Sequence, residues 1–278
     1  MDSFALIIFG ITSNLAKTKL LPALYDITAK GLLHKNTAII GIARSLKKQE
    51  HFVQEVFQSL KKSNRKEIKQ DVFRKMSQGL RYIDGNINDP ETYKKLKTLM
   101  GRLSSEGFEC NNKIFYLATY PELYLEVFEQ LKKSELNKQK NGWTRLMIEK
   151  PFGNNLSSAR KLNKLLLKYF SEDQLFRLDH YLGKETLQNI LTFRFNNGIF
   201  EHLMNKKHID HIQITVSEEF GIGERGNYYD KVGALKDVGQ NHLLQMLALA
   251  MMDTPKVFTN QAITKERVKL IKSLNPKS

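Results

Sequence analysis

Apolar residues follow two alternating patterns over the first 170 or so positions of the chain. Short, mainly apolar runs of strand length lie at 4–9, 37–42, 113–118 and 144–148, and 81–84 is a candidate short strand. Between them, apolar residues recur at helical spacing, which predicts helices over 15–29, 51–61, 121–132 and 156–170. A further helix is predicted to begin at Asp89-Pro90-Glu91, with Asp89 as its N-cap.

This alternation of strands and helices predicts crossover connections and a parallel sheet with helices on both faces. We therefore expect an α/β fold in which residues 1–175 form a Rossmann-type doubly wound domain. Pro22 stands inside the first predicted helix, where it is expected to interrupt or kink it.

The remaining residues, 176–278, show a different pattern. Residues 208–218 alternate loosely between apolar and polar, which is typical of a half-exposed antiparallel strand. Helical spacing recurs over 182–204, 239–252 and 264–274. We expect an incomplete α+β domain with antiparallel strands in this part of the chain.

The composition, with 41% hydrophobic and 26% charged residues, excludes a disordered or collagen-like chain. Cys110 is the single cysteine, so neither an internal disulfide nor a cysteine-cluster metal site is expected, and no metal is predicted. No segment reaches the roughly 18 apolar residues of a membrane span, and Asp2 stands in place of a basic leader. We expect a cytoplasmic protein with no membrane partner.

The formal net charge of +15 favours anionic partners, among them nucleic acid and phosphorylated small molecules. The charge is spread in short runs without a long basic arm, as solvated surface lysines usually are. A small phosphorylated molecule is therefore preferred to nucleic acid.

The turn after the first predicted strand has the features of a phosphate-binding loop. Gly10 stands at the turn and a helix begins directly after it, so that backbone N–H groups and the helix dipole favour an anion. Ser13 or Asn14 is expected to cap that helix. The fingerprint is incomplete because Ser13 occupies the place of a second glycine, and an ordinary strand–helix turn is the alternative. The candidate cofactor-binding residues here are Gly10, Thr12, Ser13, Asn14 and Leu15.

Arg44 follows the second predicted strand, at the position that faces the adenosine ribose in a Rossmann domain. An arginine there accommodates a 2′-phosphate, so Arg44 favours NADP over NAD; the alternative is an ordinary surface arginine.

Three later motifs are more specific: EKPFG at 149–153, RLDHYLGKE at 177–185 and KDVGQNHLLQ at 236–245. Supporting stretches lie at 7–25, 42–45, 114–121 and 218–237. With these motifs the chain, from residue 4 to at least residue 253, resembles the glucose-6-phosphate dehydrogenase family. The resemblance implies an oxidoreductase that oxidises glucose 6-phosphate to a lactone with hydride transfer to NADP, the first oxidative step of the pentose phosphate pathway.

The resemblance also implies roles for individual residues. His242 matches the base that takes the proton of the sugar C1 hydroxyl, and Asp179 matches the carboxylate that holds its tautomer. The positions that bind the substrate phosphate match His180, Tyr181 and Lys184.

Five further positions complete the implied site. Glu218 and Asp237 match carboxylates that bind sugar hydroxyls, and Lys150 matches a lysine shared between substrate and cofactor. Pro151 matches a proline whose isomer the sequence does not reveal. Tyr124 is placed near the nicotinamide, with a packed helix aromatic as the alternative.

The chain departs from the family pattern in two ways. Ser13-Asn14 replaces Gly-Asp in the coenzyme loop, which predicts weaker NADP binding. Family members also continue well beyond the C-terminal residue of this sequence, through a large antiparallel sheet that carries the subunit interface, so the oligomeric state stays open. Three interpretations follow: a short active dehydrogenase, a truncated inactive remnant, or a non-enzymatic basic binding protein. A separate chain that supplies the missing sheet is also conceivable.

Overall fold

The structure, a computed structural model, describes residues 2–63, 67–217, 221, 223 and 226–275. It divides into two compact units, Met1–Leu178 and Asp179–Ser278. Each unit is considered by itself.

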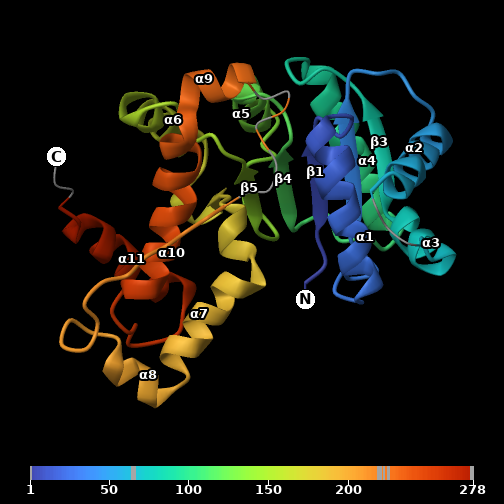
Figure 1. Cartoon of the computed structure of the whole chain (residues 1–278). Coiled ribbons are helices and arrows are strands. Elements are labelled where there is room, and N and C mark those ends of the chain that lie inside the picture. Colours follow the sequence, from blue (N-terminus) through green and yellow to red (C-terminus); the bar gives the residue numbers. More distant parts are fainter. Residues whose placement is uncertain (1, 64–66, 218–220, 222, 224–225, 276–278) are drawn as a thin grey trace. The chain divides into compact units, whose positions relative to one another are not determined.

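The first unit is built from strands and helices in alternation (Figure 1). Its strands are β1 (Ala5–Phe9), β2 (Ala38–Ala43), β3 (Leu80–Asp84), β4 (Lys113–Leu117), β5 (Thr144–Ile148) and β6 (Leu175–Arg177). Its α-helices are α1 (Leu21–Ala29), α2 (Gln49–Lys61), α3 (Gln70–Gln78), α4 (Pro90–Ser105), α5 (Tyr124–Lys133) and α6 (Leu156–Tyr169). A π-helical turn, η1 (Ala16–Leu20), precedes α1, and short 3₁₀ turns lie at η2 (Pro121–Leu123) and η3 (Glu172–Gln174).

All strand pairs of the first unit are parallel, and the strand order is β3-β2-β1-β4-β5-β6. The order reverses between β1 and β4, and in open α/β sheets the crevice at the carboxyl ends of such strands is where ligands bind. The predicted doubly wound α/β fold is confirmed.

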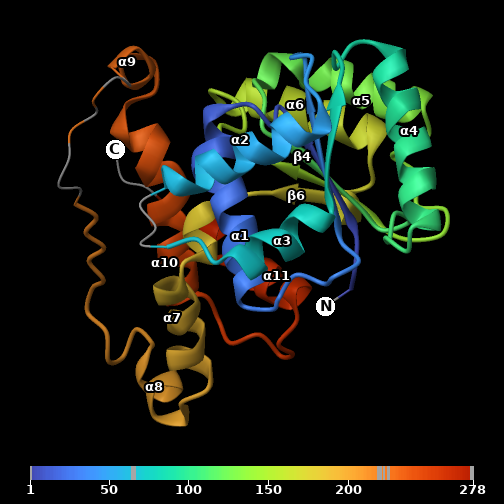
Figure 2. The same cartoon turned by 90° about the vertical axis from the view of Figure 1, so that its right-hand side faces the viewer.

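Side chains of successive strand residues enter two separate cores. In β1, Ala5, Ile7 and Phe9 pack with α4, α5 and α6, whereas Leu6 and Ile8 pack with α1, α2 and α3. The two helix groups accordingly cover opposite faces of the sheet (Figure 2). The strands read as continuous apolar runs because both faces are covered.

Local signals set the beginnings of two predicted helices. Ser13 Oγ accepts a hydrogen bond from the N–H of Ala16 at 3.2 Å, so Ser13 is the cap of the first helix. Asp89 caps α4, accepting from the N–H of Glu91 at 3.0 Å. Pro22 lies in the first turn of α1, immediately after η1, and does not break the helix. Proline lacks the N–H that an α-helical hydrogen bond requires, and the wider π turn before Pro22 lets the helix continue past it.

Two elements of the first unit have little signal in the sequence. Helix α3 buries only Val72 and Met76, and β6 is three residues long. Since β6 pairs with β5, the first unit extends to Leu178, three residues beyond the expected end at 175.

The regular elements among the described residues of the second unit are all helices or helical turns. Its elements are η4 (His180–Gly183), α7 (Glu185–Phe195), α8 (Gly198–Leu203), α9 (Gly226–Ala234), η6 (Leu235–Leu243), α10 (Leu244–Met251) and α11 (Asn260–Ser273). The antiparallel strand expected over 208–218 is wrong for 208–217, which forms no strand; Glu218 lies outside the described residues. An alternating pattern becomes a strand only when a partner supplies the ladder hydrogen bonds, and no described segment of this unit does.

A small core holds the second unit together around α7 and α10. Leu187, Leu249 and Met252 are buried. Arg194 is also buried, and its Nη1 donates to the carbonyl oxygens of Leu249 at 3.0 Å and Met252 at 2.9 Å. The guanidinium thus satisfies carbonyls at the C-terminus of α10, where the helix dipole favours a cation. Each helix among the described residues is too short or too polar to cross a bilayer.

Candidate active site

The phosphate loop lies where β1 and β4 end. Gly10 has φ +85°, and a Cβ placed on it would lie 2.5 Å from the carbonyl oxygen of Ala118. Its N–H donates to the carbonyl of Ile42 at 2.9 Å. Only glycine fits this close approach of two loops, and the resulting cradle at the sheet's carboxyl edge suits the pyrophosphate of a dinucleotide.

The other residues of the loop follow in one turn. The N–H of Ser13 donates to Gly10 at 2.9 Å, and its hydroxyl is used as the helix cap. Thr12 and Leu15 are partly buried and Asn14 is exposed. The side chain that replaces the expected second glycine therefore bonds to the start of its own helix.

Arg44 is exposed directly after β2, in a loop held by a tyrosine. The hydroxyl of Tyr82 donates to the carbonyl of Ser45 at 2.5 Å and lies 3.3 Å from that of Ala43, the two residues that flank Arg44. Burial raises the pKa of Tyr82, so its hydroxyl keeps its proton. This contact was not predictable from local patterns, because Tyr82 is 37 positions from Ser45.

Tyr124, expected near the nicotinamide, is 2% exposed and packs with Phe128, with ring centroids 6.0 Å apart. Burial raises its pKa to about 12, with a contribution from Glu149. The role as a packed helix aromatic is therefore visible in the structure, and the cofactor contact stays a prediction.

Lys150 follows β5 and is joined to Pro151 by a cis peptide bond. The neighbouring Glu149 accepts a short hydrogen bond from the hydroxyl of Tyr116. Burial and this carboxylate raise the pKa of Tyr116, which keeps it a donor. EKPFG thus begins with a carboxylate anchored to the neighbouring strand, β4.

In the second unit, two sequence-predicted residues form a hydrogen-bonded pair. His242 Nδ1 lies 2.6 Å from Asp179 Oδ1, and His242 is 2% exposed. Asp179 caps η4, so the same Oδ1 accepts from the N–H of Tyr181 at 3.0 Å. These two contacts fix the carboxylate against the ring. Because Nδ1 points toward Asp179, Nε2 is the ring nitrogen that can exchange a proton with a ligand.

Three expected phosphate-binding residues surround the pair. The ring of Tyr181 stacks on His242 at 4.0 Å with an interplanar angle of 13°. His180 meets both rings edge-on, at 4.7 Å from His242 and 4.8 Å from Tyr181. Lys184 Nζ lies 3.6 Å from the centre of the Tyr181 ring. The RLDHYLGKE motif accordingly brings an imidazole and a phenol against His242, and a cation against the phenol.

Asp237 is buried in η6, the π-helical segment that ends with Leu243, just after His242. π-Helical turns recur at functional sites because they shift side chains relative to an α-helical register. Glu218, the other carboxylate expected to bind sugar hydroxyls, lies outside the described residues.

One donor atom each from Asp179, His180 and His242 lies within 4.8 Å of the others, a spacing that would also suit a metal ion. The hydrogen bond between Asp179 and His242 already engages Oδ1 and Nδ1 with each other.

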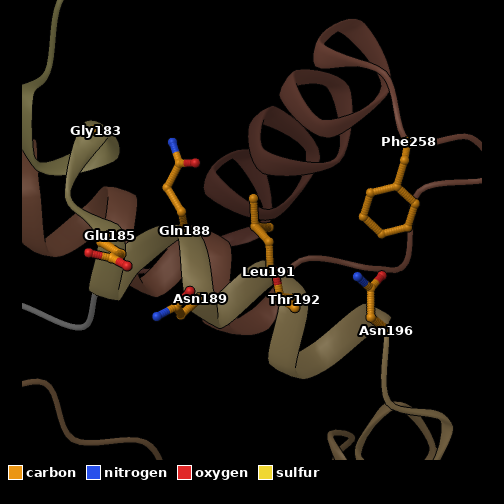
Figure 3. Close-up of a pocket in the computed structure, with 8 residues that line it drawn as sticks. All are labelled: Gly183, Glu185, Gln188, Asn189, Leu191, Thr192, Asn196 and Phe258. Atoms are coloured by element: carbon orange, nitrogen blue, oxygen red, sulfur yellow. The ribbon is translucent and has the colours of Figure 1, made fainter. Parts of the chain in front are cut away.

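A separate cavity of about 520 Å³ lies beside α7 (Figure 3). Amide side chains and Phe258 line much of it: Gly183, Glu185, Gln188, Asn189, Leu191, Thr192, Asn196 and Phe258. None of these is a predicted site residue.

Two family models match this chain. The family model "Glucose-6-phosphate dehydrogenase, NAD binding domain" matches residues 7–189, and "Glucose-6-phosphate dehydrogenase, C-terminal domain" matches 191–278. The chain belongs to the glucose-6-phosphate dehydrogenase family. Its first unit carries the dinucleotide-binding domain of that family.

Curated relatives agree with this assignment. The chain is 41% identical over 267 residues to "Glucose-6-phosphate 1-dehydrogenase 2" of Mycobacterium tuberculosis, covering 96% of this chain and 52% of the relative. It is 40% identical over 276 residues to the Chlamydia muridarum glucose-6-phosphate 1-dehydrogenase, covering 98% and 54%. The chain spans about half the length of the curated relatives it matches.

Solved structures are similar as well. One, "Glucose-6-phosphate dehydrogenase in complex with its substrate glucose-6-phosphate", superposes with a TM-score of 0.91 at 36% identity, covering 100% of this chain and 57% of that one. The glucose-6-phosphate 1-dehydrogenase of Mycobacterium avium gives 0.87 at 33% identity, covering 98% and 57%.

Proposed function

We propose that this chain oxidises glucose 6-phosphate at C1 to the lactone, with NADP as hydride acceptor. The observation that carries the proposal is the contact between Asp179 and the buried His242, 2.6 Å apart, with Tyr181 stacked on the imidazole. Family membership supports this substrate class, since relatives are named glucose-6-phosphate dehydrogenases and one similar solved structure is described as a complex with that sugar phosphate.

In the proposed reaction, the C1 hydroxyl gives its proton to His242 Nε2 while the C1–H bond breaks and the carbonyl of the lactone forms. Asp179 accepts from Nδ1, which fixes the tautomer and stabilises the imidazolium that forms. When bound, the nicotinamide accepts the hydride from C1.

The substrate phosphate is proposed to bind His180, Tyr181 and Lys184. Lys184 supplies a full positive charge and Tyr181 a hydroxyl, the donors that a phosphate dianion requires. Asp237 and Glu218 are proposed to accept hydrogen bonds from sugar hydroxyls, and Lys150 to serve both substrate and cofactor. These roles rest on the family resemblance together with the proximity of His180, Tyr181 and Lys184 to the pair.

NADP is proposed over NAD because Arg44 is exposed at the end of β2, in a loop that Tyr82 holds. The cradle at Gly10 fits a pyrophosphate, and Tyr124 is proposed to lie near the nicotinamide. In this proposal the chain works in the cytoplasm, where the buried thiol of Cys110 stays reduced.

The test is NADPH absorbance from purified chain, glucose 6-phosphate and NADP⁺, beside His242→Asn. Turnover that disappears in the variant supports the proposal for this chain alone. A folded chain, by circular dichroism and gel filtration, that yields no NADPH would overturn it and favour an inactive remnant.

A further inference from the structure

Arg267 is an unusual cation on the basic helix α11. Its side chain is half-buried, and its Nη2 donates a short hydrogen bond to Gln245 Oε1. Its Nε is buried without a hydrogen-bond partner among the described residues. Burial lowers the pKa of Arg267, so keeping the guanidinium charged here costs free energy that a solvated lysine would not incur. An arginine placed this way needs a compensating partner.

The compensation comes from the Asp179–His242 pair. The negative charge of Asp179 acts on Arg267 and opposes the effect of burial. Gln245, which receives the guanidinium hydrogen bond, lies three residues after His242 on the continuous helical stretch of η6 and α10. Residues three apart share a helix face, so Arg267 is anchored to the face that carries the imidazole.

We propose that Arg267 is a positioning residue for the Asp179–His242 pair. The bond to Gln245 fixes the guanidinium against the helix that carries His242, and its positive charge attracts the carboxylate of Asp179. The carboxylate is thereby held in place as the acceptor of the Nδ1 hydrogen, which keeps Nε2 as the atom that exchanges the substrate proton. The catalytic consequence rests on the proposed function, whereas the effect on the pair does not.

Other charged or titratable groups of the second unit face the pair from different elements. His180 and Tyr181 come from η4, and Lys184 is the residue before α7. Lys184 is exposed and lies over the Tyr181 ring, where a phosphate can reach it. Arg267 is the half-buried cation of this group, which suits a structural charge better than a ligand-binding one.

The first measurement is ¹H–¹⁵N NMR of the full chain, labelled at histidine, without substrate or cofactor. The Nδ1–H shared with Asp179 is expected as a strongly downfield resonance, and Asp179→Asn identifies it by removing it. Arg267→Gln keeps a donor for Gln245 but removes the charge, and is expected to move the resonance upfield and broaden it. Arg267→Lys, which restores a charge, is expected to bring it back toward wild type.

The second measurement is steady-state kinetics. Arg267→Gln is expected to lower kcat about tenfold with KM for glucose 6-phosphate within about twofold, because the base is misplaced and the phosphate site is intact. Lys269→Gln on the same helix is the control, since Lys269 is exposed and pairs with Asp253 at 2.5 Å; it should leave both measurements unchanged.

The two measurements separate the possible failures. An unchanged Nδ1–H resonance in folded Arg267→Gln would overturn the positioning role, whatever the kinetics. If the resonance changes as expected but the wild-type chain shows no turnover, the positioning role is supported and the proposed activity is overturned. If Arg267→Gln does not fold, Gln245→Met is the substitute, because it keeps the charge of Arg267 but removes its hydrogen-bond acceptor. A broadened Nδ1–H resonance in Gln245→Met supports the proposal, and a wild-type resonance overturns it.

Discussion

Asp179 Oδ1 lies 2.6 Å from His242 Nδ1, and the ring that it holds is 2% exposed. A second pair in the same unit has the same chemistry without the burial. Asp210 Oδ2 lies 2.9 Å from His211 Nδ1, with side chains that are 98% and 68% exposed. The comparison shows that burial, and not the mere presence of a His–Asp contact, distinguishes the candidate catalytic pair.

Asp179→Asn is expected to lower NADPH formation by about 10²–10⁴-fold, because an amide can neither stabilise the imidazolium nor select the Nδ1–H tautomer. Asp210→Asn is the matched control and should retain wild-type rates. Equal losses in the two variants, measured by initial rates on proteins of equal thermal stability, would assign no special role to Asp179.

Arg44→Ala is expected to weaken NADP⁺ binding about 10–100-fold while leaving NAD⁺ binding within about twofold, since only NADP carries the 2′-phosphate. Titration of each dinucleotide by calorimetry checks this without requiring turnover. Arg74→Ala, an exposed arginine on α3, is the control for net charge. A proportional loss for both dinucleotides in Arg44→Ala would contradict the assignment.

Gly10→Ala is expected to destabilise the first unit by about 3 kcal/mol, from a positive φ and from a methyl group 2.5 Å from the Ala118 carbonyl. Gly31→Ala isolates the first cause, because Gly31 has φ +67° but nothing within 4 Å of a Cβ; we expect about 1 kcal/mol there. Urea denaturation compares the two. Similar midpoints would mean that the loops beside Gly10 move apart at little cost.

Tyr124→Phe is expected to make the chain less sensitive to alkali. Burial raises the folded-state pKa of Tyr124 from 10.0 to about 12, so the unfolded chain releases this proton first. The stability that this raised pKa contributes is therefore fully present below about pH 10 and is lost as the pH rises toward 12. The loss between pH 9 and pH 11 is about 1 kcal/mol.

The phenylalanine variant should show a shallower decline of the free energy of unfolding over that range, as measured in urea. Tyr120→Phe is the control, because Tyr120 is 77% exposed. A decline as steep as in wild type would show that Tyr124 ionises normally in the folded chain.

Much of the first unit was predictable because its signals are local. A buried parallel strand needs a continuous apolar run, and a covering helix needs apolar residues at its own period. The strands β1, β2, β4 and β5 and the helices α1, α2, α4, α5 and α6 were therefore predictable. Caps such as Asp89 and the glycine turn at Gly10 also act within a few residues. The strand expected over 208–217 was wrong because strand formation is not local: alternation without a pairing partner does not make a strand.

The sequence by itself determined the alternation of strands and helices, the turn that suits a pyrophosphate, and the motifs that carry the site residues. The tertiary structure decided which of them meet and how deeply they are buried. Asp179 and His242 are 63 positions apart, and Arg267 is 22 positions from Gln245. Hydrogen bonds of this range leave no periodic trace in the chain, because they depend on how helices pack and not on the residues beside each partner.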